Sequence, residues 1–367
     1  MTMPPAQRGS TSSGFRSVRI VGLILSLAVG RAEAAENASA PQPAPRVARL
    51  GAETFHVEKN HTGGAIVRLH GETVGEYVVD RANKPFLWRL AGPTGKSMTR
   101  SFPMIEVPGG TTDHVHQRGL SFSHQGVGGF DTWSEPATFR DEVKDSARLA
   151  TVGAIRHVGY RTLAGGTTGV IHARNDFMDA SNRPLLAEER RMTFSVGPAS
   201  RIIDVDIDLI AAYGPIELAD MKDAGLSIRV PDSMTVDRGL GGAIVNSAGQ
   251  RDAAAWSRRA LWVDYHGPVD GEHLGIAILN HPTSFRHPTP WHVRTYGLFC
   301  ASPFGMKQMD PAAESGAVSM TAGQRISLRH RVIFHVGDEQ RGGIAAAYEA
   351  YAAERPAPLS TEEGSNP

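Results

Sequence analysis

Residues 203–209 read Ile-Asp-Val-Asp-Ile-Asp-Leu, so that apolar residues and Asp alternate without exception. Successive side chains of a strand point to opposite faces of its sheet. This stretch therefore predicts a strand with one apolar, buried face and one face that carries Asp204, Asp206 and Asp208. Three carboxylates on one face can hold a cation, but such a face is more often solvated, and we expect solvation here.

The same period of two recurs on both sides of this stretch. Residues 185–196, 201–211 and 324–336 are expected to form long strands, and shorter strands are expected at 226–230, 242–247, 260–265 and 273–279. The 40 Gly and 23 Pro residues favour many turns. The one convincing helical segment is 343–354, which is rich in Ala and has Tyr348 and Tyr351 three residues apart.

These patterns predict an all-β fold, a large antiparallel two-sheet β-sandwich with one C-terminal helix. We find no internal repeat, long linker or break in composition within 46–355, which is expected to be a single domain. Residues 356–367 are polar and are expected to form a flexible tail. The sole cysteine, Cys300, lies in an apolar segment and is expected to be buried by packing.

The amino-terminal segment has the features of a secretory signal peptide. Arg8, Arg16 and Arg19 precede an apolar run at 20–30, which ends before Ala-Glu-Ala at 32–34. An apolar run of about eleven residues is too short to cross a bilayer. We therefore expect residues 1–34 to be a signal peptide and 35–45 a disordered leader. The mature protein would be periplasmic or extracellular, with no membrane span.

The formal net charge of zero at pH 7 gives no basic face, so nucleic acid is not an expected partner. The expected partner is a small-molecule or oligosaccharide substrate, because polar and aromatic residues gather in two stretches. One is residues 113–133 and the other residues 280–297. We expect the two stretches to meet in the fold and to form one polar site.

The first stretch contains Asp113, His114, His116, Arg118 and His124. On an unbroken strand the three His would face the same way, together with Arg118. Neutral imidazoles beside a carboxylate are candidate ligands of a divalent metal. The candidate set here is Asp113, His114, His116 and His124. An His-x-His pair is weak evidence, and the chain lacks His-Glu-x-x-His, so no metal or cofactor is assigned.

The alternative use of this stretch is acid–base chemistry, since His titrates near neutral pH. His116 and His124 are then the candidate proton carriers. Asp113, His114 and Arg118 would bind the substrate, and Trp133 would supply apolar surface.

In the second stretch, proline stiffens a loop that carries His281, His287, Trp291 and His292. His292 is the third candidate proton carrier. Arg294 and Tyr296 would share its face if the chain is extended. A stacking ring, a cation and a phenol suit a polyhydroxylated ligand. The expected substrate-binding residues outside the first stretch are His281, His287, Trp291, Arg294 and Tyr296, together with Lys222.

Several pieces of the chain together resemble the family of secreted bacterial proteins known as the PmoA or DUF6807 family. Gln117 stands where the family usually has a second His, and Gly128-Gly129 where it has Asn-Gly. The resemblance implies a large sandwich similar to galactose mutarotase-like folds. The matching pieces are Lys84-Pro-Phe, Thr99-Arg-Ser-Phe-Pro, Asp113-His-x-His with Arg118-Gly-Leu and Phe122-x-His124, Glu188-Glu-Arg-Arg, Asp220-x-Lys222, Trp262-Val-Asp-Tyr, and 281–282 with 290–299.

Three hypotheses follow for the function. The first is an exported carbohydrate-active enzyme that hydrolyses, eliminates or epimerises a sugar with His and Arg. The two-carboxylate plan of ordinary glycosidases is not visible as a motif, which argues against simple hydrolysis. The second is a metal-dependent oxygenase or hydrolase with a His cluster. The third is a glycan-binding protein that uses the same pocket without turnover.

Overall fold

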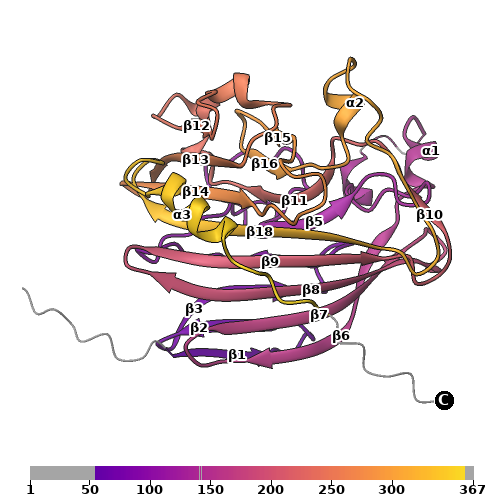
Figure 1. Cartoon of the computed structure of the whole chain (residues 1–367), viewed down its shortest axis with the longest axis horizontal. Coiled ribbons are helices and arrows are strands. Elements are labelled where there is room, and N and C mark those ends of the chain that lie inside the picture. Colours follow the sequence, from indigo (N-terminus) through magenta and orange to yellow (C-terminus); the bar gives the residue numbers. More distant parts are fainter. Residues whose placement is uncertain (1–53, 140, 142, 360–367) are drawn as a thin grey trace, which may run out of the picture. The chain divides into compact units, whose positions relative to one another are not determined.

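The computed structural model describes residues 54–139, 141 and 143–359. The predicted signal peptide and leader lie outside the described residues, and so do residues 360–367 of the predicted tail. The described chain folds into two antiparallel sheets of eight strands each, with a further two-stranded pair (Figure 1). This confirms the prediction of an all-β, two-sheet sandwich.

Sheet 1 combines the early strands of the chain with three that come much later. β5 pairs with β11, and β11 pairs with β16, so that residues near 120, 226 and 300 lie side by side. In spatial order the strands are β1 (Phe55–Lys59), β2 (Ala65–Leu69), β3 (Glu72–Val78), β4 (Phe86–Trp88), β5 (Leu120–His124), β11 (Ala224–Arg229), β16 (Leu298–Ala301) and β15 (Trp291–Val293).

Sheet 2 contains the long strands that the alternating patterns predicted, and Figure 1 shows β9, β8 and β7 running side by side. In spatial order the strands are β12 (Ala243–Asn246), β13 (Trp262–Val269), β14 (Glu272–Asn280), β18 (Arg325–Val336), β9 (Ser200–Ile210), β8 (Pro184–Gly197), β7 (Gly169–Met178) and β6 (Ala154–Ala164). The two-stranded pair is β10 (Ile216–Leu218) with β17 (Val318–Met320).

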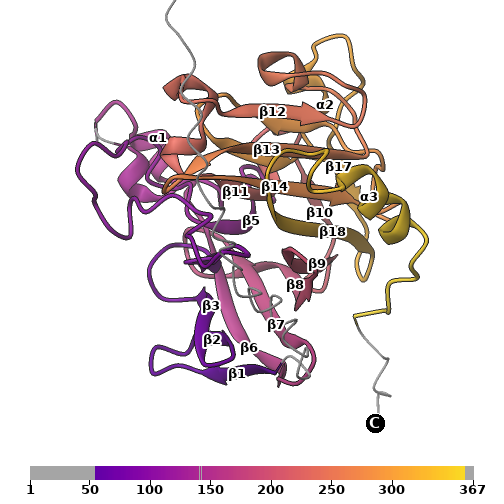
Figure 2. The same ribbon diagram turned by 90° about the vertical axis from the view of Figure 1, so that its left-hand side faces the viewer.

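Helices are few and short. They are α1 (Ser146–Leu149), α2 (Met306–Met309) and α3 (Ile344–Ala352), with single 3-10 turns at Pro136–Thr138, Asp232–Met234, Val236–Arg238 and Asp252–Ala255. The predicted C-terminal helix is confirmed as α3, which packs Tyr348 and Tyr351 on the outer face of sheet 2 (Figure 2). In the described part of the chain, none of the helices has the length and apolar character that crossing a bilayer requires.

The main hydrophobic core lies between the two sheets. Alternate residues of each strand enter it, such as Leu226 and Ile228 from β11, and Val205 and Ile207 from β9. The residues between them therefore lie on the outer face of their sheet. On sheet 1 that outer face carries Ser121, Ser227, Arg229, His292 and Cys300.

The carboxylates of β9 share one face, as predicted, but the prediction that this face is solvated is wrong. Asp208 is 3% exposed and accepts hydrogen bonds from Arg329 Nη2 at 2.6 Å and from Ser327 Oγ at 2.7 Å. Asp204 and Asp206 are likewise paired with arginines of β18 and β8. The register sets Arg329 and Arg331 beside these carboxylates, so the face is a ladder of ion pairs.

Residues 356–359 lie against this ladder, although they belong to the predicted tail. Arg191 of β8 donates a hydrogen bond from Nη2 to the carbonyl oxygen of Ala357 at 2.9 Å, and Leu359 is buried. The same guanidinium contacts Asp206 at 2.7 Å, so one arginine joins the ladder to the C-terminal segment.

Replacing Asp208 with Ala should lower the free energy of unfolding by about 3 kcal/mol, because it removes the main carboxylate partner of the buried Arg329. Urea unfolding at pH 7 measures the change. The exposed Glu217, which has no ion pair among the described residues, is the control, and Glu217→Ala should change stability by less than about 0.5 kcal/mol. A loss below about 1 kcal/mol for Asp208→Ala would mean that water or Asp206 replaces the missing partner.

Candidate functional site

The stretch that precedes β5 is a turn and not a strand. The backbone has positive φ angles at His114 (45°) and Gly119 (46°), and β5 begins only at Leu120. A Cβ atom at Gly119 would lie 2.0 Å from the carbonyl oxygen of Leu87, so only glycine fits there. The prediction that His114, His116 and His124 share one strand face is therefore wrong.

Asp113 is held between two buried arginines. Arg100 Nη1 lies 2.7 Å and Arg229 Nη2 3.1 Å from its Oδ1, and His114 Nδ1 is bonded to its Oδ2. Burial opposes ionisation of Asp113, but Arg229, His114 and Arg100 together hold the pKa of its carboxyl well below the usual range. Asp113 is therefore a fixed anion that neutralises arginine charge, and it is not a base.

Tyr296 brings the second polar stretch onto the first, as the sequence predicted. Its ring stacks on His114, with centroids 4.9 Å apart and an interplanar angle of 6°. The guanidinium carbon of Arg229 lies 4.8 Å from the same ring. Gln117 joins the two, because its Oε1 accepts a bond from Arg229 at 2.6 Å and its Nε2 donates to the Tyr296 hydroxyl at 3.4 Å. Burial raises the pKa of Tyr296, which keeps the phenol protonated at neutral pH.

His116 lies next to His114, with ring centroids 5.8 Å apart. Its Nδ1 is 3.0 Å from Thr138 Oγ1, and its Nε2 has no hydrogen-bond partner among the described residues. Burial lowers the pKa of His116 to about 3, and the nearby charge of Lys84 adds to the effect. The ring is therefore neutral at pH 7, and His116 is buried, with 9% of its surface exposed.

Arg294 continues the cluster toward β15. Its guanidinium carbon lies 5.7 Å from the ring centroids of both Tyr296 and Trp256. The Trp256 indole N–H donates to His292 Nδ1 at 2.9 Å, which fixes His292 as the tautomer protonated at Nε2. Burial lowers the pKa of His292 to about 4, although Asp223 Oδ1 lies 3.5 Å from its Nε2 and opposes the shift.

Lys222 lies at the edge of the cluster, where it contacts Asp223, the residue beside His292. Its Nζ contacts Asp223 Oδ2 at 2.7 Å, so its charge is paired. The predicted site residues that the structure brings together are thus Asp113, His114, His116, Lys222, His292, Arg294 and Tyr296. We call these, with Arg100, Gln117, Arg229, Asp223 and Trp256, the His–Arg cluster. Trp133 packs beneath it against Leu298, Cys300 and Tyr296, and is 3% exposed.

Arg118, a predicted substrate-binding residue, is not brought into the cluster. Arg118 forms two parallel hydrogen bonds with Glu135, at 2.8 and 2.7 Å, and is largely buried. Lys84 Nζ lies 3.6 Å from the same carboxylate, and burial lowers its pKa to about 8. The charges of Arg118, Lys84 and Glu135 thus hold the segment around Glu135 against the start of β4, which stabilises the fold.

His124, a predicted catalytic residue, is not part of the cluster, so the structure separates it from His116 and His292. It follows Leu120 and Phe122 on the core face of β5, where its ring contacts Phe304 at a centroid distance of 4.8 Å. Its Nδ1 accepts the backbone N–H of Gly126 at 2.9 Å. The candidate metal set of Asp113, His114, His116 and His124 therefore does not converge on one point, because His124 faces the other side of the strand.

Three residues of the second stretch also point elsewhere. Trp291 is fully buried in the main core and donates its indole N–H to the carbonyl of Ala260 at 3.0 Å, so it offers no stacking face to a ligand. His281 and His287 lie at α3, where their rings meet Tyr351 and Tyr348. The structure therefore does not bring these three predicted substrate-binding residues into the cluster. Trp291 alternates with His292 in β15, whereas His281 and His287 lie in the turns between β14 and β15.

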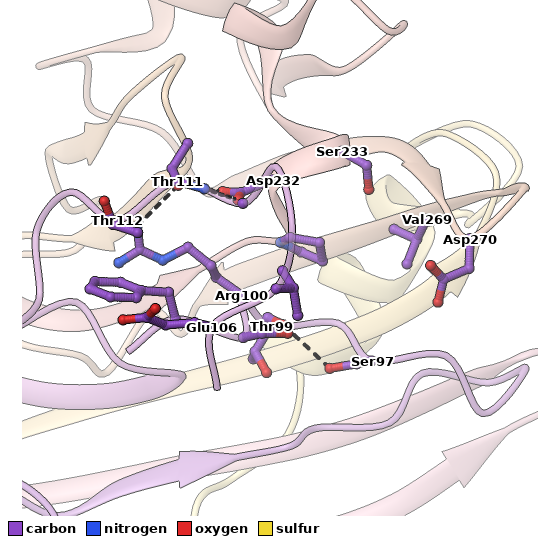
Figure 3. Close-up of a pocket in the computed structure, with 15 residues that line it drawn as sticks. Ser97, Thr99, Arg100, Glu106, Thr111, Thr112, Asp232, Ser233, Val269 and Asp270 are labelled. Carbon is purple, nitrogen blue, oxygen red and sulfur yellow. Dashed lines mark hydrogen bonds between the residues drawn. The ribbon is translucent and has the colours of Figure 1, made fainter. Parts of the chain in front are cut away.

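A cavity of about 320 Å³ adjoins the cluster (Figure 3). Most of its lining residues are of polar types, among them Arg100, Thr111 and Asp232, and none is a His. Thr111 Oγ1 contacts Arg100 Nη1 at 3.3 Å and Asp232 Oδ1 at 2.7 Å. The cavity is at the lower end of the range for small-molecule pockets. Arg100 belongs both to the lining of this cavity and to the His–Arg cluster.

Sequence reasoning missed Arg100, Arg229, Asp223 and Trp256. Arg229 had a readable signal, because Gly225, Ser227 and Arg229 alternate with apolar residues in β11, which puts a charge on a strand that is buried on both faces. Asp223 and Trp256 had no such signal in the sequence, because only the fold brings them into contact with His292.

The fold and this cluster define a two-sheet β-sandwich protein with a buried, arginine-rich polar site on the outer face of sheet 1. The chain belongs to DUF6807, a family of unknown function, whose sequence profile matches residues 65–349. Comparison with curated proteins gives no match.

Solved structures with a similar course of the chain include the galactosidase domain of the α-galactosidase–sucrose kinase AgaSK (6% identity, TM-score 0.40, covering 77% of this chain and 42% of that one). The α-galactosidase AgaB from Geobacillus stearothermophilus gives 12% identity, a TM-score of 0.39 and coverage of 78% and 42%. A galactose mutarotase related enzyme from Lactobacillus acidophilus is 8% identical with a TM-score of 0.31, and the match covers 77% of this chain and 97% of that one. The chain spans less than half of the two α-galactosidase chains. Likenesses of this size carry no argument about activity.

Replacing Trp256 with Phe should raise the pKa of His292 above its value of about 4, because the indole N–H bond to Nδ1 favours the neutral ring. The change is measured by following the imidazole carbon-bound protons by NMR between pH 3 and 8. Trp262→Phe, on the outer face of sheet 2, is the control and should leave the titration of His292 unchanged. An unaltered pKa in Trp256→Phe would rule out this hydrogen bond.

The burial of His124 predicts a pH dependence of stability. Burial lowers its pKa to about 3, so below pH 6.5 the unfolded state binds a proton that the folded state does not. Stability is thus lost as the pH falls. His124→Gln should remove about 1.4 kcal/mol of the loss between pH 7.5 and 5.5, measured by urea unfolding at both pH values. Parallel pH profiles of the variant and the wild type would show that His124 is accessible to protons in the folded state.

Proposed function

We propose that this protein is an exported enzyme that acts on a carbohydrate bearing a carboxylate, and that the reaction is proton abstraction beside that carboxylate. The observation that carries the proposal is the environment of Arg294. Lys222, Arg100 and Arg229 each have a carboxylate partner within the cluster, whereas Arg294 has none among the described residues. The amino-terminal sequence supports the export.

Arg294 suits an anionic ligand for two reasons. A partly buried guanidinium without a counter-ion gains from a carboxylate, which it binds through two parallel hydrogen bonds. The rings of Trp256 and Tyr296 on either side fix its plane and offer apolar surface to the C–H face of a sugar. A neutral sugar would leave the charge uncompensated, so the cluster favours uronate over hexose.

His116 is the group that can take the proton. It is neutral at pH 7, and its Nε2 is free of protein partners among the described residues. A ring with a pKa near 3 is a weak base, but a substrate carboxylate beside it would raise that pKa. His116 then accepts the proton from the carbon next to the carboxylate, and the electron pair passes into an enediolate that Arg294 stabilises.

Two outcomes follow from the enediolate. If the bond from the neighbouring carbon to its oxygen substituent breaks, the electron pair forms a carbon–carbon double bond and the leaving oxygen takes a proton, which the Tyr296 hydroxyl can supply. If a proton returns to the opposite face of the carbon, the product is an epimer. Hydrolysis by two carboxylates is less well supported, because Asp113 is committed to Arg100 and Arg229.

Arg294→Gln should weaken the binding of uronates by about 10- to 100-fold and leave the weak binding of neutral sugars unchanged. Isothermal titration of residues 35–367 with oligogalacturonate and oligoglucuronate, against the corresponding neutral oligosaccharides, measures this. Arg258→Gln is the matched control, because Arg258 is exposed and has no ion pair among the described residues. Equal affinity of Arg294→Gln and wild type for every uronate would contradict the proposal.

His116→Gln should bind uronates normally and lose turnover. Epimerisation is followed by NMR, as incorporation of deuterium from D2O at the carbon beside the carboxylate. Elimination leaves no hydrogen on that carbon and is followed by the ultraviolet absorbance of the new double bond, which is conjugated to the carboxylate. Binding that depends on Arg294, with neither deuterium incorporation nor an unsaturated product in the wild type, would identify a uronate-binding protein in place of an enzyme.

A further inference from the structure

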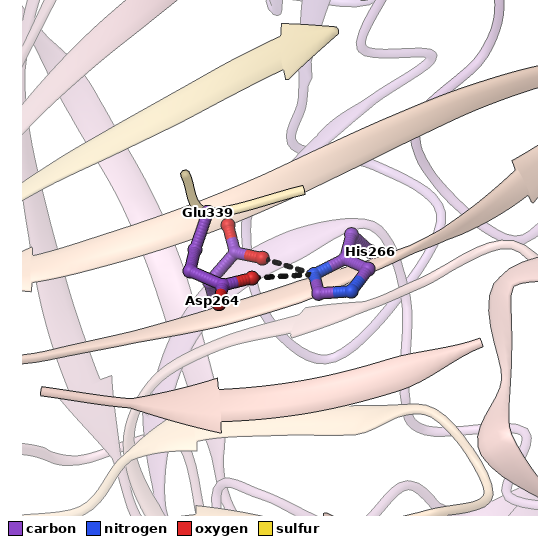
Figure 4. A group of neighbouring side chains, drawn as sticks. All are labelled: Asp264, His266 and Glu339. Atoms are coloured by element: carbon purple, nitrogen blue, oxygen red, sulfur yellow. Dashed lines mark hydrogen bonds and ion pairs between the residues drawn. The ribbon is translucent and has the colours of Figure 1, made fainter. Parts of the chain in front are cut away.

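A second polar cluster lies on the opposite side of the sandwich from the His–Arg cluster. Asp264 and His266 are two residues apart in β13, so both face outward while Val263 and Tyr265 enter the main core. Glu339 approaches them from the turn that follows β18 (Figure 4). One ligand-type atom from each of these three residues lies within 4.8 Å of the others.

The three side chains converge at their ligand atoms. His266 Nδ1 lies 2.6 Å from Asp264 Oδ1 and 3.7 Å from Glu339 Oε2. Two carboxylate oxygens and one imidazole nitrogen form a donor set that first-row divalent transition metals accept, whereas Ca²⁺ and Mg²⁺ prefer oxygen alone. His273 is exposed, and its ring centroid is 5.4 Å from that of His266, but it is not among the residues whose ligand atoms converge.

Asp264 is oriented by a residue that is not itself at the centre. His335 of β18 donates from Nε2 to Asp264 Oδ2 at 2.6 Å, and both side chains are almost completely buried. To reach Asp264 the imidazole crosses Gly275 of β14, where a Cβ atom would lie 2.1 Å from the ring. A carboxylate that binds a metal through one oxygen and is held by a hydrogen bond through the other is a common arrangement around protein metal ions.

The charge of the cluster also favours a divalent cation. Asp264 is fully buried, and Glu339 is largely buried in its side chain. Their nearest cationic side chain among the described residues is Arg251, which touches Glu339 Oε1 at 3.4 Å but is 59% exposed. A proton on His266 would supply one positive charge to this pair of poorly solvated carboxylates. A divalent ion would supply two positive charges and so compensate both carboxylates.

We propose that Asp264, His266 and Glu339 bind one divalent transition-metal ion, with His335 as the residue that positions Asp264. The ion joins β13 to the turn after β18 and so fastens the segment that leads into α3. This site is separate from the His–Arg cluster, and it does not depend on the function proposed there. It also differs from the metal set that the sequence suggested, since none of its residues is shared with that set.

The test uses residues 35–367, purified without a His tag, stripped with a chelator and titrated with Zn²⁺. We expect about one equivalent to bind and the Tm to rise with the Zn²⁺ concentration. Glu339→Gln and His266→Gln should lose this binding and the Tm shift, and His335→Gln should weaken binding by about 10- to 100-fold. Ca²⁺ should give neither effect.

Two controls separate this site from other acidic and imidazole groups. Glu349→Gln, on the exposed side of α3, and His56→Gln, on β1, should both bind Zn²⁺ as the wild type does. Glu339 lies in a turn and its substitution should leave the sheet intact, which circular dichroism confirms. Absence of stoichiometric binding in the wild type, or unchanged binding in folded Glu339→Gln, would overturn the proposal and identify the cluster as an ion pair of protonated His266.

Discussion

The ion pair between Arg229 and Asp113 is the interaction on which the rest of the site depends. Arg229 lies in β11 with its side chain almost completely buried, and an unpaired charge there would cost several kcal/mol. The carboxylate that compensates it comes from a turn more than a hundred residues earlier in the chain, and Arg100 approaches the same carboxylate. This requirement brings the segment before β5 back across sheet 1 and places His114 and His116 beside Tyr296.

Paired charges fulfil the same role elsewhere in the sandwich. Glu135 holds Arg118 and Lys84 at the start of β4, Glu188 holds Arg190 in β8, and Asp208 holds Arg329 in β18. Asp208 and Arg329 lie on the outer face of sheet 2, whereas Glu188 and Arg190 lie on the face of β8 that also sends Leu186 and Met192 into the main core. Buried charges need specific partners, whereas apolar side chains do not, so these pairs select one arrangement of the loops among many.

The outer faces are also where the chemistry of the protein is concentrated. On sheet 1, burial keeps His116 and His292 neutral and leaves Arg294 as the cation without a carboxylate among the described members of the cluster. On sheet 2, Asp264, His266 and Glu339 form a compact group with an excess of negative charge. The two groups have opposite charge and lie on opposite sides of one core, which allows one to bind an anion and the other a cation without direct competition.

The sequence by itself determined the two sheets, the long strands of sheet 2 and helix α3, because a period of two and a change to an Ala-rich segment are local properties of the chain. The density of polar residues also predicted one polar site with His116, His292, Arg294 and Tyr296, which lie in one cluster in the structure. Only the tertiary structure decided which side each residue faces. The positive φ at His114 and Gly119 breaks the strand period before β5, so His124 faces the core while His114 and His116 lie in the turn. Trp291 enters the core from β15. Partners such as Arg229 for Asp113 are set by strand pairing across long distances, which no local pattern encodes.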